Sequence, residues 1–245
     1  MLELILSDIT VMGQGYCVIG LEEPSPGAFR SIRPMPPWGF AWREPFPFRR
    51  GDRVRMQFQP TTTARPHVED AKSCGLIGTG RSIPQEDLVR YLKKAEVSQD
   101  LEHLFGCQVE CGSSGGRAVW VNPADACRSI CGCEYENLRF RLYPESQGFT
   151  LRAEIILSSG ERINSIPVVD RDWRKFVAEL VQRIHRSNPL PLAERFMNRR
   201  ISDKLLTRPE MFARVGLPRP REDQRCWLML DSLFPQPESS WLSLL

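Results

Sequence analysis

Alternating apolar and polar residues predict that much of this chain forms short β-strands. The alternation is strictest at 53–59, as expected for a strand with one buried face. Segments rich in glycine, proline and serine separate the runs and predict turns. Other β-like runs lie at 2–7, 16–21, 29–33, 117–121, 137–143, 149–157 and 162–170, with two short strands inside 211–236. These runs indicate a mainly β protein.

Helical spacing of apolar residues is confined to three places. Residues 85–104 carry it and predict a short helical connector with charges on its other face. Asp170 is a candidate N-cap for a helix over 173–185. Residues 192–206 predict one further short helix. The helical connector at 85–104 favours a domain boundary near residue 100.

A proline-rich segment at 34–48 interrupts the β pattern. Proline cannot donate a hydrogen bond to a neighbouring strand, so pairing of the preceding strand should stop near Arg33. The segment cannot form a helix, yet it holds two tryptophans and three phenylalanines, which is too aromatic for a free linker. We expect an ordered loop with partly buried rings at Trp38, Trp42, Phe46 and Phe48.

Two successive groups of about five short strands fit two small Greek-key barrels in tandem, with a few short helices between strands. The OB-fold is the commonest barrel of this size. We expect an N-terminal OB-like barrel over 1–100 and a C-terminal OB-like barrel with a cysteine-rich insertion over 101–245. At 245 residues, the chain is long enough for each barrel to bury its own core.

The charge of the chain is mildly basic, with a formal net charge of +3. Arginine supplies 28 of the 33 basic residues, and its guanidinium forks onto phosphates and stacks on bases. An equally good explanation is a high G+C content of the genome. No run approaches the ~18 apolar residues of a membrane span. The N-terminus lacks a basic region and carries an early acid, so we expect a cytoplasmic protein without a signal peptide.

Five of the eight cysteines form a cluster with the spacing C-x3-C-x15-C-x3-C-x-C. Four thiolates of such a set could hold zinc tetrahedrally or ligate an iron–sulfur cluster. The alternative is a group of small, partly buried thiols. The candidate metal ligands are Cys107, Cys111, Cys127, Cys131 and Cys133.

Arginines on the strands suggest a surface for the backbone of a nucleic acid. Arg139, Arg141 and Arg152 should share one face of a sheet, which is either such a surface or an ordinary solvated face. Aromatic rings, including Phe46, Trp120 and Trp227, are candidates for stacking on bases. The candidate nucleic-acid-binding residues are Arg33, Trp38, Trp42, Arg49, Arg53, Arg55, Arg139, Arg141, Arg214 and Arg219.

His67, Glu69 and Asp70 place three possible acid–base or metal-binding groups within four residues. They suggest a metal-assisted hydrolase, or else a loop held by local hydrogen bonds. The chain contains no Walker loop, G-x-S-x-G or H-E-x-x-H motif, so a non-catalytic binding protein is favoured. The apolar tail at 238–245 could dock onto a partner or fold back onto its own barrel.

Eight short motifs follow one another along the chain: CVIG at 17–20, SIRP at 31–34, FRRGD at 48–52, PHVED at 66–70, IPVVDRDW at 166–173, VGLPRP at 215–220, CWL at 226–228 and FP at 234–235. In this order they resemble the bacterial dual OB-containing domain family. The resemblance implies two OB barrels, a nucleic-acid or nucleotide ligand, and an accessory role in a bacterial defence or mobile-element system. It carries over no catalytic residues. The chain departs from the family at Val169-Asp170, where a Thr-Asp pair is typical, and in its cysteine cluster. A separate alternative is a protein-interaction adaptor whose barrels recruit an effector such as a nuclease or ATPase.

Overall fold

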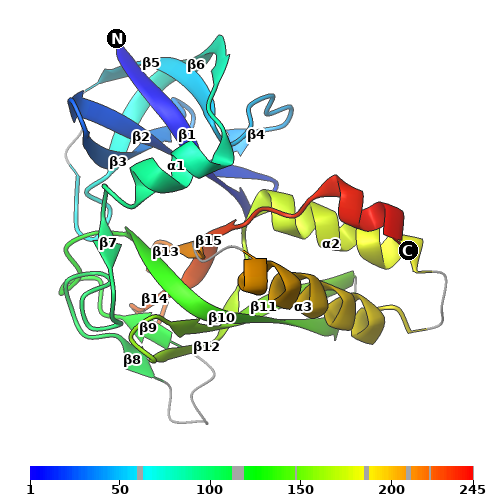
Figure 1. The fold of residues 1–245 in the computed structure, drawn as a ribbon. Coiled ribbons are helices and arrows are strands. Elements are labelled where there is room, and N and C mark those ends of the chain that lie inside the picture. The colour runs from blue at the N-terminus through cyan, green and yellow to red at the C-terminus, as the bar shows by residue number, and fades with distance from the viewer. Residues whose placement is uncertain are drawn as a thin grey trace.

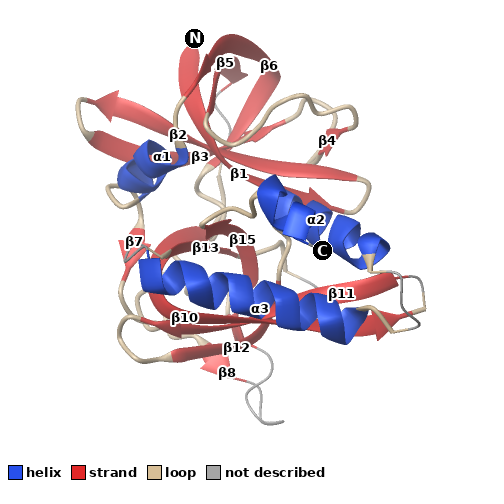
Figure 2. Ribbon diagram, turned by 45° about the vertical axis from the view of Figure 1, so that its right-hand side comes forward, coloured by secondary structure: helices blue, strands red, loops and turns tan. Residues whose placement is uncertain are grey.

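The computed structural model describes residues 1–59, 63–111, 119–146, 148–184, 188–207, 211–220 and 222–244, and it is mainly β (Figure 2). The N-terminal part of the chain forms a closed five-stranded barrel (Figure 1). The hydrogen-bonded order is β1-β5-β6-β3-β2, and β1 closes the ring by pairing with β2. All of these pairs are antiparallel except β3 with β6, and the arrangement is compatible with an OB-fold. The strands are β1 (Leu2–Met12), β2 (Gly15–Ser25), β3 (Ala28–Met35), β5 (Asp52–Gln59) and β6 (Asp70–Ser82).

Side-chain alternation explains how β1 supports both the barrel and its surroundings. Leu4 and Leu6 point into the barrel core, where they pack with Val54 and Met56 of β5. Ile5, on the opposite face of β1, is also buried, in a different cluster outside the barrel. The strand is therefore apolar on both faces, which is why its sequence reads as a nearly continuous apolar run.

The proline-rich segment is ordered, as predicted, but β3 does not stop at Arg33. It continues to Met35 in parallel pairing with β6. The Pro34 carbonyl accepts a hydrogen bond from Trp42 Nε1 (2.8 Å) on the side away from β6. The backbone N and O of a strand residue point to the same side of the strand. The N–H that Pro34 lacks would therefore point away from β6, and its absence removes no hydrogen bond to that strand. Trp42 itself belongs to the short strand β4 (Trp42–Arg43), which pairs with β2.

A short helix joins the barrel to the rest of the chain. Helix α1 (Gln85–Leu92) is shorter than the helical connector expected over 85–104. After it, β7 (Val97–Ser98) already pairs in parallel with β10, a strand of the second sheet. The helix ends early because the chain at 97–98 is held by this sheet instead.

The C-terminal part of the chain contains a second sheet of six strands, five of which follow the order β12-β11-β10-β13-β15 while β7 pairs with β10. The predicted meander is confirmed as β10, β11 and β12, and the two strands expected within 211–236 pair as β13 and β15. A parallel bridge between Val168 and Leu230 brings the segment after β12 next to β15. The strands are β10 (Ile130–Glu145), β11 (Gly148–Leu157), β12 (Arg162–Pro167), β13 (Phe212–Gly216) and β15 (Met229–Phe234).

Two helices lie between β12 and β13 in the chain and run alongside each other beside the second sheet (Figures 1 and 2). Asp170 caps the first one, as predicted, by accepting from the backbone N–H groups of Asp172 and Trp173. None of the helices within the described residues is long and apolar enough to cross a membrane. The remaining elements are α2 (Arg171–Arg183), α3 (Leu190–Thr207), the small sheet of β8 (Glu110–Cys111), β9 (Val119–Val121) and β14 (Cys226–Trp227), and a 3-10 turn at Ser239–Leu244.

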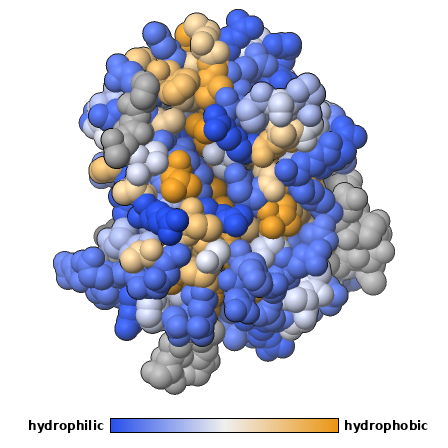
Figure 3. Space-filling model, turned by 90° about the vertical axis from the view of Figure 1, so that its left-hand side faces the viewer, coloured by the Kyte–Doolittle hydropathy of each residue, from blue (hydrophilic) through white to orange (hydrophobic). Residues whose placement is uncertain are grey.

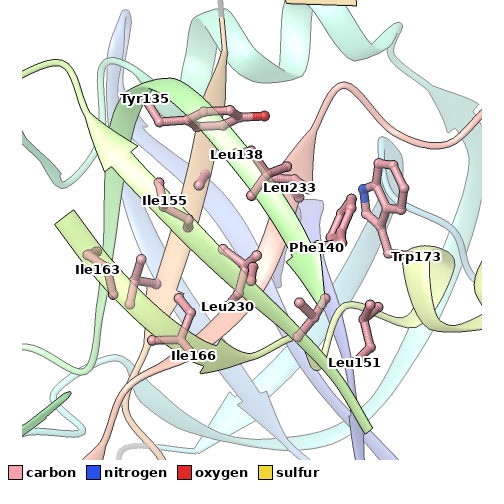
Figure 4. Close-up of a cluster of buried hydrophobic side chains, with 14 of the residues drawn as sticks. Tyr135, Leu138, Phe140, Leu151, Ile155, Ile163, Ile166, Trp173, Leu230 and Leu233 are labelled. Carbon is pink, nitrogen blue, oxygen red and sulfur yellow. The ribbon is translucent and has the colours of Figure 1, made fainter. Parts of the chain in front are cut away.

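The larger core lies between the second sheet and the helices α2 and α3, and Figure 4 shows part of it. Trp173, from the first turn of α2, is fully buried with its ring 4.7 Å from that of Phe140 on β10. Trp241, in the C-terminal turn, packs against Trp173 at 6.1 Å, so this part of the tail folds back onto its own core.

A separate apolar cluster joins the two halves of the molecule. Its members come from β1, β2 and β3 of the barrel, from α1, and from β13 and β15 of the second sheet. Large exposed apolar side chains are concentrated on the N-terminal half: among the described residues all but Tyr143 lie within 1–77, and Figure 3 shows the apolar surface mainly over the barrel and its junction with the second half. The cluster consists of Ile5, Leu21, Phe29, Leu88, Val89, Leu92, Phe212 and Phe234.

Candidate nucleic-acid interface

A cleft of about 1030 Å³ lies where the proline-rich loop of the barrel faces α2 of the second half. The loop contributes residues 44–50, and the first two turns of α2 form the opposite side. The start of β11 and two residues after β15 complete the wall. Segments from both halves therefore build this cleft together.

Three exposed cations line the cleft without a carboxylate partner. Arg49 belongs to the loop, and Arg174 and Lys175 belong to α2. Within the described part of the chain, none of the three forms an ion pair. The two carboxylates of the wall are already engaged, since Glu44 accepts from Tyr16, and Asp172 binds Arg50 and Arg171. The cleft is consequently suited to a ligand with several negative charges.

Aromatic rings line the same cleft. Phe46 and Phe48 pack edge to face at 5.4 Å, an arrangement that leaves part of each ring at the surface. Tyr16 from β2 and Phe149 from β11 are half-buried in the same wall. Such rings can accept a flat partner by stacking.

The Arg171 side chain connects the two walls of the cleft. Its Nη1 donates to the Phe48 carbonyl (3.0 Å), its Nε pairs with Asp172 (3.2 Å), and its guanidinium lies 5.7 Å from the Tyr16 ring. The position of α2 relative to the loop is thereby fixed before any ligand binds.

Beneath the cleft, Arg50 forms a buried clamp with two carboxylates. Its side chain is 2% exposed and donates two hydrogen bonds to Asp170 (2.8 and 3.0 Å) and two to Asp172 (2.8 and 3.0 Å). Burial lowers the pKa of Arg50, but the Asp170 and Asp172 carboxylates outweigh it and leave the pKa above its ordinary value. The guanidinium also lies over the Phe234 ring at 5.5 Å. Arg50 is therefore a permanently charged structural link rather than a free ligand contact.

Three of the predicted nucleic-acid contacts are buried, which does not fit that role. Arg33 and Arg214 lie between the two halves, where Arg33 pairs with Asp70 (3.0 Å) and Arg214 donates to Ser31 (2.8 Å) and faces Asp8 (3.6 Å). Trp42 is part of the barrel core. All three side chains are at most 7% exposed, so they do not present a surface to phosphates or bases.

The other predicted residues are dispersed over the surface. Arg49 lines the cleft, and the candidate stacker Phe46 does so too. The remainder lie elsewhere: Arg53 and Arg55 pair with Glu3 (3.1 and 3.5 Å), Arg141 pairs with Glu194 (3.1 Å), Arg219 pairs with Asp70 (2.6 Å), Trp38 is exposed, and Arg139 is exposed in a separate hollow of about 720 Å³ beside α3.

Sequence reasoning missed most of the cleft. Trp120 and Trp227 were expected to stack on bases. Their rings instead lie 4.3 and 6.0 Å from the Arg225 guanidinium, and neither residue lines the cleft. Arg174 and Lys175 escaped notice, although their position is informative: they are adjacent cations on the polar face of a helix whose cap, Asp170, was recognised. The exposed face of that helix is the signal that could have found them.

The cysteines do not converge on a metal in the part of the chain that the structure describes. No group of three or more histidine, cysteine, aspartate or glutamate side chains is placed to hold one there. Cys131 and Cys133 are buried in β10, and burial raises the pKa of the Cys131 thiol to about 12. Cys107 and Cys127 are half-buried. The Cys111 side chain lies outside the described residues, so a zinc or iron–sulfur site that includes it stays a prediction.

His67 and Asp70 share Arg33 as a partner, whereas Glu69 binds Ser129. His67 Nδ1 accepts from Arg33 Nη1 (2.7 Å), and Asp70 binds the same arginine. Both oxygens of Glu69 accept from Ser129, one from its backbone N–H (2.9 Å) and one from its hydroxyl (2.7 Å). Because Ser129 belongs to the second half, this loop connects the halves. The geometry favours the loop held by hydrogen bonds over the hydrolase.

Comparison of the chain with protein-family models, with curated proteins and with solved structures gives no match.

Proposed function

We propose that this protein binds a single-stranded nucleic acid in the cleft between the proline-rich loop and α2. The observation that carries the proposal is the cleft wall itself, where Arg49, Arg174 and Lys175 have no described ion-pair partner and lie beside half-buried rings. Proteins that bind single strands without sequence preference combine a positive groove with rings on which bases stack. The phosphates would lie on the cations, and Phe46 or Phe149 would stack on bases.

The topology of the second sheet supports a dual OB arrangement. Starting from β10, its strands follow the order of the closed N-terminal barrel, and the bridge between Val168 and Leu230 is parallel like the pair of β3 and β6. We propose that the second sheet is a second barrel of the OB type. An accessory role in a bacterial defence or mobile-element system follows from the family resemblance and stays a prediction, as does recruitment of a partner such as a nuclease or ATPase.

A salt titration tests the binding proposal. Fluorescence anisotropy of labelled twelve-nucleotide oligo-dT and oligo-U would be measured with the purified protein over a range of KCl concentrations. Three phosphate contacts predict that the logarithm of the association constant falls with the logarithm of salt with a slope of about −2, at about −0.7 per phosphate on a single strand. An affinity that is flat in salt would show that phosphate neutralisation is wrong.

Variants separate the cleft from the general charge of the protein. Arg174→Ala/Lys175→Ala should reduce the steepness of the slope by about 1.4. The matched control is Lys72→Ala/Arg162→Ala, which removes the same charge from exposed positions on β6 and β12 outside the cleft. If both double variants lose affinity equally, the cleft is not the binding site. Phe46→Ala should cost about 1–3 kcal/mol if a base stacks there.

A further inference from the structure

A second cavity, separate from the cleft, lies between the two halves of the molecule. Its volume is about 110 Å³, and it is formed by strands of the barrel together with β15 and the segment after β13. Much of its wall is apolar, with Met12, Met35, Leu217 and Met229 among the lining residues. The partly exposed side chains of Phe40 and Arg219 also line it, with the Arg219 guanidinium 4.3 Å from the centre of the Phe40 ring.

Three buried polar side chains in the cavity wall have atoms without a hydrogen-bond partner. They are Arg33 Nε, His67 Nε2 and Asp231 Oδ1, on residues that are only 7%, 4% and 5% exposed. A buried polar atom without a partner costs free energy, so such atoms are uncommon and call for an explanation. A molecule bound in the cavity would supply the missing partners.

Hydrogen bonding fixes which atoms of the wall are donors. A guanidinium can only donate, so Arg33 Nη1 donates to His67 Nδ1 and the ring proton resides on Nε2. Burial and the nearby Arg33 charge lower the pKa of His67 to about 4, which keeps the ring neutral at pH 7. The Pro218 carbonyl lies near the ring but leaves Nε2 unbonded. Arg33 Nε and His67 Nε2 are thus two unused N–H donors on one cavity.

The charges of the wall favour an anion. Arg33 and Arg219 are the cations, and both bind Asp70, which lies outside the lining (3.0 and 2.6 Å). Asp231 is the one carboxyl group among the described lining residues, and burial raises its pKa to about 8, so it is mostly protonated at pH 7. At neutral pH the lining carries two positive charges and little negative charge, and the Asp70 and Glu69 carboxylates that offset them lie outside the lining.

The size of the cavity limits the ligand. A dry cavity of about 150 Å³ admits benzene, so 110 Å³ corresponds to about four to six non-hydrogen atoms. We propose that this cavity binds a short aliphatic monocarboxylate of two to four carbons, whose carboxylate accepts from Arg33 Nε and His67 Nε2 while its alkyl chain packs on Met35 and Leu217. Two donors match the acceptor group, and the apolar wall matches the tail. This site does not depend on nucleic-acid binding in the cleft.

Calorimetric titration of the intact protein with sodium butyrate tests the proposal. Butyramide, which has the same shape without the charge, and sodium chloride at equal ionic strength are the controls. We expect butyrate to bind at least tenfold more tightly than butyramide. If butyrate gives no heat beyond that of sodium chloride, or binds no better than butyramide, the cavity holds water alone and the proposal is wrong.

A pH series on the unmodified protein gives an independent readout. The groups that face Asp231 are Asp8 on β1, Cys17 on β2, Arg33 on β3, Arg214 on β13 and Asp170 before α2. Ionisation of Asp231 between pH 7 and 9 would place a negative charge in the cavity and weaken butyrate binding about tenfold, as a pKa of about 8 requires. Butyramide binding should change far less. A butyrate affinity that is constant over this range overturns the proposed position of the carboxylate.

Two variants complete the test. Leu217→Trp fills the cavity and should abolish butyrate binding, provided that circular dichroism shows a folded protein. Val68→Ala changes an exposed neighbour of His67 that does not line the cavity, and it should bind butyrate like the wild type. Butyrate binding that survives in a folded Leu217→Trp protein would place the ligand elsewhere and refute the site.

Discussion

Replacing Asp170 by alanine should destabilise the protein more than most single substitutions. Its carboxylate is fully buried and accepts two hydrogen bonds from Arg50, and one each from the backbone N–H groups of Asp172, Trp173 and Leu233. Removing one partner of a buried ion pair costs about 3–5 kcal/mol. Losing the N-cap of α2 adds about 1 kcal/mol. We expect the free energy of unfolding to fall by about 4–6 kcal/mol, against a total of about 5–15 kcal/mol for an ordinary domain.

Urea unfolding followed by circular dichroism and tryptophan fluorescence measures this loss. The urea midpoint should fall while the slope of the transition is retained, which indicates a change in stability alone. Asp170→Asn separates the two contributions, because asparagine caps helices as well as aspartate does but cannot pair with Arg50 as an anion. This variant should lose most of the stability contributed by the ion pair and little of the stability contributed by the helix cap.

Asp172→Ala is the matched control for this experiment. Asp172 also binds Arg50, but its side chain is 28% exposed. An ion pair with that access to solvent contributes about 0–1 kcal/mol. If Asp170→Ala lost no more stability than Asp172→Ala, the reasoning that burial makes the clamp strong would be refuted.

Three further substitutions or conditions test other contacts of the fold. Below pH 6.5 the unfolded chain protonates His67, whereas in the folded protein the pKa of this residue is about 4. The free energy of unfolding should therefore decrease by about 3 kcal/mol as the pH falls from 6.5 to 4. The urea midpoint should fall over this range, and its dependence on pH should be weaker in His67→Gln. Gly216→Ala would add a Cβ that overlaps the Asp231 carboxylate, and thermal unfolding should show a loss of about 1–3 kcal/mol. Tyr135→Phe removes a buried hydroxyl that donates to the Phe234 carbonyl (2.7 Å), and urea unfolding should show a loss of about 1–2 kcal/mol.

Controls for these three tests are available in the same chain. An unchanged pH dependence in His67→Gln would assign the acid sensitivity to other groups. Gly78→Ala, whose Cβ would meet only the ring edge of Phe48 at 3.1 Å, should be milder than Gly216→Ala. A Tyr135→Phe protein as stable as the wild type would mean that the Phe234 carbonyl is satisfied without the hydroxyl.

Local patterns in the sequence predicted the elements better than their partners. Alternation located the strands because a strand exposes one face and buries the other, and Asp170 was recognised because a cap acts on residues two and three positions later. The same alternation cannot tell a solvent face from a face covered by another part of the chain. Arg33 and Arg214 were assigned to a ligand for that reason, although their contacts are Ser129 and Ser31, 96 and 183 residues away.

The cleft illustrates the same limit of prediction from sequence. Its wall combines Arg49, from a loop that was expected to be ordered, with Arg174 and Lys175, from a helix that was expected to form. Each piece was predicted separately, but their meeting depends on Arg50 and Asp170 joining segments 120 residues apart. Contacts over such separations leave no periodic signal in a single sequence.

The apolar cluster between the halves has a consequence for how the protein can be divided. A fragment ending near residue 100 would retain Phe29 and Leu88 but lose Phe212 and Phe234, which cover them in the intact chain. Each fragment would expose an apolar surface and tend to aggregate, even if it folded on its own. The two halves should accordingly melt in one cooperative transition, and the smallest soluble unit for expression or crystallisation should contain both.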